Sequence, residues 1–221
     1  MRAINEFSWQ ARKSEATRSG IMEAALACFL NIGYTNTTVS KIALEARISR
    51  GAIMHHFDSR IDIIKSAINY LVDKRIEEFQ HSLDTTIAPI ARSEVSKATL
   101  TETVNALWAF FRLPSFYTFQ ELLLAARTDA ELAEIIQPAQ QRFDNAINES
   151  ITLMFPVWKD KNSARVLVND LFHFTLQGMA LSDMLKQDEE RTQNLLMLLI
   201  ENGIHQYEQA ETLIRQCKTA R

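Results

Sequence analysis

The chain has 221 residues, of which 47% are hydrophobic and 23% charged, and this balance excludes an intrinsically disordered protein. Its 24 basic and 27 acidic residues give a net charge of −3, so the overall charge points to no particular class of partner. Only five glycines and four prolines interrupt the chain, which favours an all-α fold.

Targeting and redox signals are weak. No apolar run approaches the roughly 20 residues that span a bilayer, and the N-terminus lacks the apolar segment of a signal peptide. The two cysteines, Cys28 and Cys217, suggest no disulfide framework. We therefore expect a cytoplasmic protein that does not interact with membranes.

Charge is distributed unevenly along the chain. Residues 1–60 contain eight Lys and Arg against five Asp and Glu, a net of +3, whereas residues 61–221 contain 16 against 22, a net of −6. A basic head on an acidic body indicates that the head meets a polyanion, although a difference of this size is weak evidence alone.

The first predicted helix covers residues 14–32, where apolar residues recur with helical spacing on one face. Gly33 is a natural helix stop, and Thr37 or Thr38 can cap a second helix that ends near Ala46. Residues 1–13 lie before this pattern. They could form an arm that follows a minor groove, or a tail without a role.

A third, short helix follows at residues 50–57, with Ser49 as its cap, and a long fourth helix covers residues 60–82. Two short helices joined by a three- or four-residue turn, with a third helix packed behind them, form a helix-turn-helix. In that motif the second short helix enters the major groove.

Within this third helix, Ile53 and Phe57 would anchor the helix to the core. The residues expected nearer to DNA are Arg50, Gly51, Ala52, His55 and His56. Gly51 and Ala52 have almost no side chain, so the helix backbone could approach the duplex closely. Adjacent histidines point about 100° apart on a helix, so a shared metal ion or a plain solvated pair are weaker alternatives to DNA contact.

The stretch GYTNTTVSKIALEARISRGAIMHHFDSR, residues 33–60, resembles the DNA-binding domain of TetR-family transcriptional regulators. The resemblance implies a fold that is all-α, with a three-helix helix-turn-helix head and a larger helical ligand-binding and dimerisation domain, about nine helices in total. It places the DNA-binding domain at residues 1–60 and the effector-binding and dimerisation domain at residues 61–221.

Carried over residue by residue, the resemblance assigns DNA contacts to matching positions. Thr38, Ser40 and Arg60 would bind phosphates, with Lys41 as a further candidate. Arg50 and Ala52 would face bases, and His55 and His56 would contact a phosphate or a base edge. Two positions depart from the family pattern, because Arg47 replaces a turn glycine that often has positive φ and Met54 replaces a phosphate-binding tyrosine.

The body is predicted to contain five more helices. They cover residues 97–112, 115–127, 129–155 with a kink near Pro138, 163–186 and 189–216, with loops or broken helix at 83–96 and 156–162.

The last two helices are apolar over more than one face, as central core helices or the helices of a dimer interface would be. The resemblance favours a homodimer through these helices. The candidate interface residues are Leu171, Thr175, Gly178, Leu196, Leu199 and Ile200. Two reading heads in such a dimer would match a palindromic operator.

The resemblance also implies an effector cavity, and an aromatic-rich set of residues could line it. The candidates are Trp108, Phe111, Phe116, Phe119, Phe143, His173 and Gln177. Ordinary core packing is the commoner role for such residues, above all for His173 between two phenylalanines. A pocket of this composition would take an apolar or aromatic ligand.

The resemblance therefore predicts a DNA-binding transcriptional regulator, a repressor released from its operator by a small, largely apolar effector. An activator, or a DNA-binding protein without an effector, is the alternative. A helical enzyme or small-molecule carrier is more remote, because the sequence contains no Walker loop, HExxH or GxSxG motif. We expect no catalytic residues, no metal and no cofactor.

Overall fold

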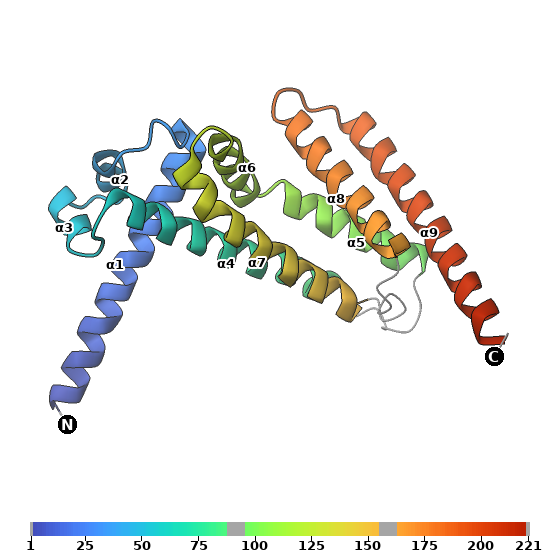
Figure 1. Cartoon of the computed structure of the whole chain (residues 1–221), viewed down its shortest axis with the longest axis horizontal. Helices are drawn as coiled ribbons and strands as arrows, with labels where there is room; N and C mark the ends of the chain where they lie inside the picture. Colours follow the sequence, from blue (N-terminus) through green and yellow to red (C-terminus); the bar gives the residue numbers. More distant parts are fainter. Residues whose placement is uncertain (1, 88–95, 155–162, 220–221) are drawn as a thin grey trace. The chain divides into compact units, whose positions relative to one another are not determined.

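The structure of the protein is a computed structural model that describes residues 2–87, 96–154 and 163–219 (Figure 1). Over these ranges it contains nine α-helices and no strand, which confirms the predicted all-α fold. The helices are α1 (Arg2–Ile32), α2 (Val39–Glu45), α3 (Arg50–Met54), α4 (Arg60–Ile87), α5 (Lys97–Phe111), α6 (Pro114–Ala126), α7 (Ala130–Met154), α8 (Ser163–Asp183) and α9 (Glu189–Thr219).

Several helix boundaries differ from those predicted, and α8 and α9 end at Asp183 and Thr219, each three residues from the expected end. Helix α1 begins at Arg2, so residues 2–13 are helical and form no extended arm, as suits a stretch without glycine or proline. Helix α3 ends at Met54 and not at Phe57, because His55 caps it. Helix α4 continues to Ile87, while the predicted loop at residues 156–162 lies outside the described residues.

Short polar side chains fix where the helices begin. The Thr38 hydroxyl accepts from the N–H of Lys41 at 3.3 Å, and the Ser49 hydroxyl accepts from the N–H of Ala52 at 3.0 Å. Thr38 is therefore the cap of α2, whereas the Thr37 hydroxyl donates to the carbonyl of Gly33 at 2.8 Å. The first residue of α2 and that of α3 are thus each set by a hydroxyl that lies directly before the helix.

The chain divides into two compact units. Unit 1 contains residues 1–75 and 114–143, and unit 2 contains residues 76–113 and 144–221. Helices α6 and the first half of α7 thus belong with the helix-turn-helix. The division predicted after residue 60 is one of function and stays a prediction. No helix in the described ranges is long and apolar enough to cross a membrane.

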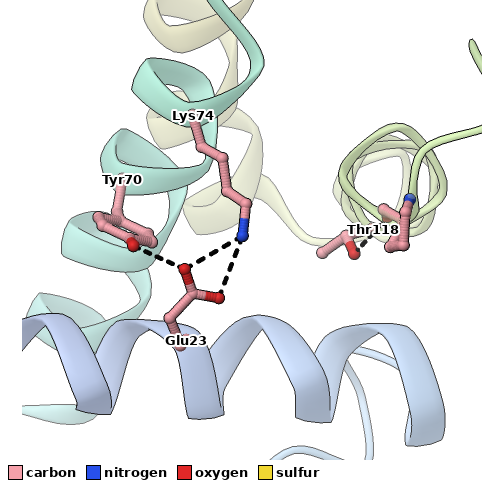
Figure 2. Close-up of polar contacts among 5 residues, drawn as sticks. Glu23, Tyr70, Lys74 and Thr118 are labelled. Carbon is pink, nitrogen blue, oxygen red and sulfur yellow. Dashed lines mark hydrogen bonds and ion pairs between the residues drawn. The ribbon is translucent and has the colours of Figure 1, made fainter. Parts of the chain in front are cut away.

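The core of unit 1 joins α1 to the helix-turn-helix and to α4. Its largest fully buried side chains include Ile21, Phe29, Ile53, Phe57, Ile63, Ile64, Ile68, Leu71, Phe116, Phe119 and Phe143. At the edge of this core, Glu23 of α1 accepts from the Tyr70 hydroxyl at 2.6 Å and from Lys74 at 3.1 Å (Figure 2). Burial raises the pKa of the Glu23 carboxyl, but these two partners outweigh it, so the pKa lies below its ordinary value.

Helices α6 and α7 join unit 1 through aromatic and ionic contacts with α4. The Arg75 side chain is 2% exposed, and its guanidinium carbon lies 4.0 Å and 4.5 Å from the ring centres of Phe143 and Phe119. Arg142 of α7 donates to the carbonyl of Asn69 and pairs with Asp73, both at distances near 3 Å. Within α6, the Thr118 hydroxyl donates back to the carbonyl of Pro114 at 2.9 Å (Figure 2).

Unit 2 is built around α5, α8 and α9, with α8 and α9 side by side (Figure 1). Phe110 contacts both Phe79 and Phe111 in edge-on arrangements, at centre distances of 5.4 and 5.5 Å. At Gly203, α9 approaches its neighbours so closely that a Cβ would lie 2.6 Å from Phe172 and 2.7 Å from Leu100.

Candidate nucleic-acid interface

The turn between α2 and α3 keeps the positive φ that is frequent for a glycine at this place, although the residue here is Arg47. Arg47 has φ of +55°, the only positive φ among the described residues other than glycine. The N–H groups of Arg47 and Ile48 donate to the carbonyls of Leu44 and Ala43, at 3.1 and 3.0 Å. These bonds hold the turn although an L-residue in this conformation costs about 1–2 kcal/mol.

Helix α3 has one buried and one exposed side. Ile53 and Phe57 are almost fully buried, as predicted for the anchors. Arg50 and Gly51 in the first turn of α3 and its cap residue His55 are exposed, while Ala52 and His56 are half-buried. An added Cβ at Gly51 would meet only the Ser49 hydroxyl, at 3.8 Å, so packing inside the chain does not require a glycine there.

The start of α2 is exposed beside this helix in the same unit. Thr38, Ser40 and Lys41 all have exposed side chains. The ammonium of Lys41 donates to the carbonyl of Asn36 at 2.9 Å, which holds it close to the α2 N-terminus. A hydroxyl, a cation and the exposed N–H groups of a helix N-terminus are groups that bind phosphate.

Arg60, at the start of α4, belongs to a polar network that the sequence did not reveal. Its guanidinium carbon lies 5.3 Å from the ring centre of Tyr34. The Tyr34 hydroxyl donates to Asp129 at 3.1 Å, and the Tyr34 N–H donates to Glu121 at 3.0 Å. The turn after α1 is thereby attached to α6 and to the start of α7.

Two pKa values in this network depart from their ordinary values. The N–H of Leu132 donates to Asp129 and lowers the pKa of that carboxyl; burial opposes the shift, and Tyr34 and Arg60 add to it. Burial raises the pKa of the Tyr34 hydroxyl. The charge of Arg60 lowers this pKa and that of Asp129 raises it, and the net shift is upward. No sequence signal links these groups, because Tyr34 and Asp129 are 95 residues apart.

A second contact missed by sequence reasoning joins α1 to the end of α3. Arg18 donates from Nη1 to the backbone carbonyl of His56, and its guanidinium carbon lies 4.3 Å from the centre of the Phe57 ring. Arg18 lies 38 residues before His56, so neither helical spacing nor a local motif could pair them.

The predicted effector residues are divided between the two units. Phe116, Phe119 and Phe143 are buried in unit 1, and the last two lie against Arg75. Trp108, Phe111, His173 and Gln177 belong to unit 2. There the half-buried His173 lies edge-on to Phe111 at 5.3 Å and to Phe174 at 5.5 Å, an arrangement that suits a core histidine.

The predicted interface residues also fall into two groups. Leu196, Leu199 and Ile200 are buried within the single chain, because this side of α9 packs inside unit 2. Leu171 and Gly178 are exposed and Thr175 is half-buried. The described part of α8 and α9 exposes other large apolar residues that were not predicted, namely Phe174, Met197 and Leu198.

Comparisons with known proteins agree with this geometry. Residues 21–67 match the profile of the family described as bacterial regulatory proteins, tetR family. The transcriptional regulator CymR of Pseudomonas putida is 22% identical over 200 residues, which cover 90% of this chain and 94% of CymR.

Solved structures share the fold over most of the chain. A transcriptional regulator from Rhodococcus sp. Rha1 matches with a TM-score of 0.61 and 18% identity, over 83% of this chain and 94% of that one. LfrR from Mycobacterium smegmatis, in complex with proflavine, matches with a TM-score of 0.53 and 16% identity, over 85% of this chain and 96% of that one. The matched helix-turn-helix, together with likeness over most of the chain, identifies this protein as a transcriptional regulator of the TetR family.

Proposed function

We propose that the protein binds a palindromic operator as a homodimer and represses transcription until a small, largely apolar effector releases it. The observation that carries the DNA-binding part is the two-sided α3. Ile53 and the following Phe57 are buried, whereas Arg50 at the start of α3 and the cap residue His55 at its end are exposed, and Gly51 adds no side chain to the exposed surface.

Each exposed group at the head receives a proposed role. Arg50 is suited to guanine, whose N7 and O6 accept two hydrogen bonds from a guanidinium, and Ala52 is proposed as a second residue that faces the bases. Thr38, Ser40 and Lys41 would contact phosphates of one DNA strand, and His55 and His56 would contact a phosphate or a base edge. Arg60 would reach a phosphate from its place over Tyr34.

Selection of bound sequences from a random DNA pool tests these proposed DNA contacts. The wild type should enrich a palindrome whose binding weakens steeply with salt. Arg50→Ala should lose discrimination at one base pair of each half-site by about tenfold or more, whereas Lys41→Ala should weaken all sequences alike and reduce the salt slope by about one. Enrichment of the same sequence by wild type and Arg50→Ala would exclude Arg50 as a base reader.

The homodimer is proposed to form through α8 and α9. Leu171, Phe174 and Gly178 share one side of α8, because their spacing is three and four residues, and all three are exposed. A Cβ at Gly178 would meet nothing within 4 Å, so a partner helix could approach closely there. On α9 we propose Met197 and Leu198, since Leu196, Leu199 and Ile200 are already buried within one chain.

The effector is proposed to bind among aromatic residues of the body and to move α4, which would alter the spacing of the two heads. LfrR, which shares the fold, was solved with the planar aromatic compound proflavine. Release requires the ligand to favour the conformation that does not bind DNA.

A panel of apolar and aromatic compounds, beginning with proflavine, tests release of the selected operator. A repressor with an effector should lose operator affinity with at least one compound, and Trp108→Ala should change the concentration that is needed. Operator binding that no compound alters would favour a constitutive DNA-binding protein.

A further inference from the structure

The end of the recognition helix is held by an arginine from α1. Arg18 donates to the backbone carbonyl of His56, and its guanidinium carbon lies 4.3 Å from the centre of the Phe57 ring. His56 and Phe57 follow α3 within three residues of its last residue, Met54. The contact therefore joins α1 to the segment in which α3 ends.

Helix α3 needs such support because it has only five residues. A helix of this length is not stable alone, and its last carbonyls lack partners inside the helix. Ser49 satisfies the N-terminal end, and Ile53 anchors the middle. At the other end, the Ile53 carbonyl accepts from the N–H groups of His56 and Phe57 at 2.8 and 3.1 Å, and Arg18 binds the carbonyl of His56 just beyond this turn.

We propose that Arg18 is a positioning residue for operator recognition, which fixes the orientation of α3 through His56 and Phe57 and makes no DNA contact of its own. The inference rests on the proposed operator binding. It requires arginine specifically, because a planar guanidinium can place a face against an aromatic ring while an N–H in its plane reaches a carbonyl. A lysine ammonium has no such plane.

The competing role for an exposed arginine on the head is a direct phosphate contact. The two roles predict different salt dependence. A phosphate contact contributes about one to the slope of log affinity against log salt, and lysine can replace arginine in it. A positioning residue leaves the slope and the non-specific affinity unchanged, while specific affinity falls.

The experiment compares Arg18→Met and Arg18→Lys with the wild type. Arg127→Met is the matched control, since Arg127 is an exposed cation of the same unit, in the turn after α6. Three quantities are measured: affinity for the operator selected by the wild type over a salt series, affinity for unrelated DNA, and amide hydrogen exchange of residues 53–57 without DNA.

We expect both Arg18 variants to lose operator affinity about tenfold, the range for one hydrogen bond to a charged group, with the salt slope unchanged. Amides of residues 53–57 should exchange faster in both variants, whereas Arg127→Met should match the wild type in every measurement. Exchange is decisive here because losing a phosphate contact would not alter the protein without DNA.

Two results would overturn the proposal. A slope reduced by about one, with unchanged exchange and recovery in Arg18→Lys, would make Arg18 a phosphate contact. Wild-type operator affinity in both variants would remove Arg18 from recognition. If Arg18→Met does not fold, Arg18→Lys keeps the charge and decides the question. If the wild type selects no sequence, the proposed function fails, while the exchange comparison still shows whether Arg18 holds α3.

Discussion

At the scale of single residues, Arg47 has a backbone conformation that glycine adopts at no cost. Its φ of +55° lies in the left-handed region. We expect Arg47→Gly to raise the free energy of unfolding by about 1 kcal/mol, because the left-handed penalty exceeds the added freedom of glycine in the unfolded chain. Urea denaturation measures this change in the free energy of unfolding. Arg47→Ala is the control, since it removes the side chain but keeps the Cβ, and equal stability of the two variants would contradict the strain.

Asp129 should make stability depend on pH in the acid range. Its pKa is lowered in the folded chain, so the ionised carboxyl stabilises the fold above the unfolded pKa of about 4, and this contribution is lost as pH falls through the folded pKa. We expect Asp129→Asn to be less stable than the wild type at pH 7, with the difference shrinking below pH 4. Chemical denaturation at several pH values checks this, and a constant difference would exclude the carboxylate as its source.

At the scale of elements, α3 depends on its cap. The Ser49 hydroxyl accepts from the N–H of Ala52 at 3.0 Å, at the start of a helix of five residues. We expect Ser49→Ala to cost about 1 kcal/mol and to expose the amides of α3 to exchange, with Ser49→Thr close to the wild type because threonine keeps the hydroxyl. Unchanged exchange in Ser49→Ala would mean that tertiary contacts alone hold the helix.

The packing of α9 depends on the absence of a side chain at Gly203. A Cβ there would lie 2.6 Å from Phe172 and 2.7 Å from Leu100. We expect Gly203→Ala to destabilise the fold by about 1–3 kcal/mol, because both neighbours must move. Gly20→Ala is the matched control, since nothing lies within 4 Å of a Cβ there, and it should stabilise α1 by about 1 kcal/mol. Thermal unfolding of the two variants should shift in opposite directions.

At the scale of the whole molecule, the exposed apolar residues of α8 and α9 predict the assembly. Phe174 is 65% exposed, which is unusual for a large aromatic residue unless a partner covers it. We expect Phe174→Glu to weaken the dimer at least about tenfold, and operator affinity with it, because one head reads only one half-site. Analytical ultracentrifugation measures the dimer.

The control is Leu124→Glu, which introduces the same charge at a residue that is 66% exposed in the other unit. It should leave the dimer intact. Equal dissociation of both variants would trace the effect to charge and not to the α8 face.

The sequence by itself determined the local structure of the head. Ser49 caps α3 through a hydroxyl that reaches three residues along the chain, one of the two candidate threonines, Thr38, caps α2 in the same way, and Gly33 ends α1. The burial of Ile53 and Phe57 was also predicted, although Phe57 lies beyond the end of α3. Such features depend on neighbours within a few residues, so the order of the residues contains the information.

Only the tertiary structure decided which distant groups meet. Arg18 binds the backbone carbonyl of His56 from 38 residues away, Tyr34 binds Asp129 from 95 residues away, and α6 joins unit 1. It also decided which side of α9 is buried. Leu196, Leu199 and Ile200 face the inside while Met197 and Leu198 face solvent, because a helix that is apolar on several sides packs according to where its neighbours lie.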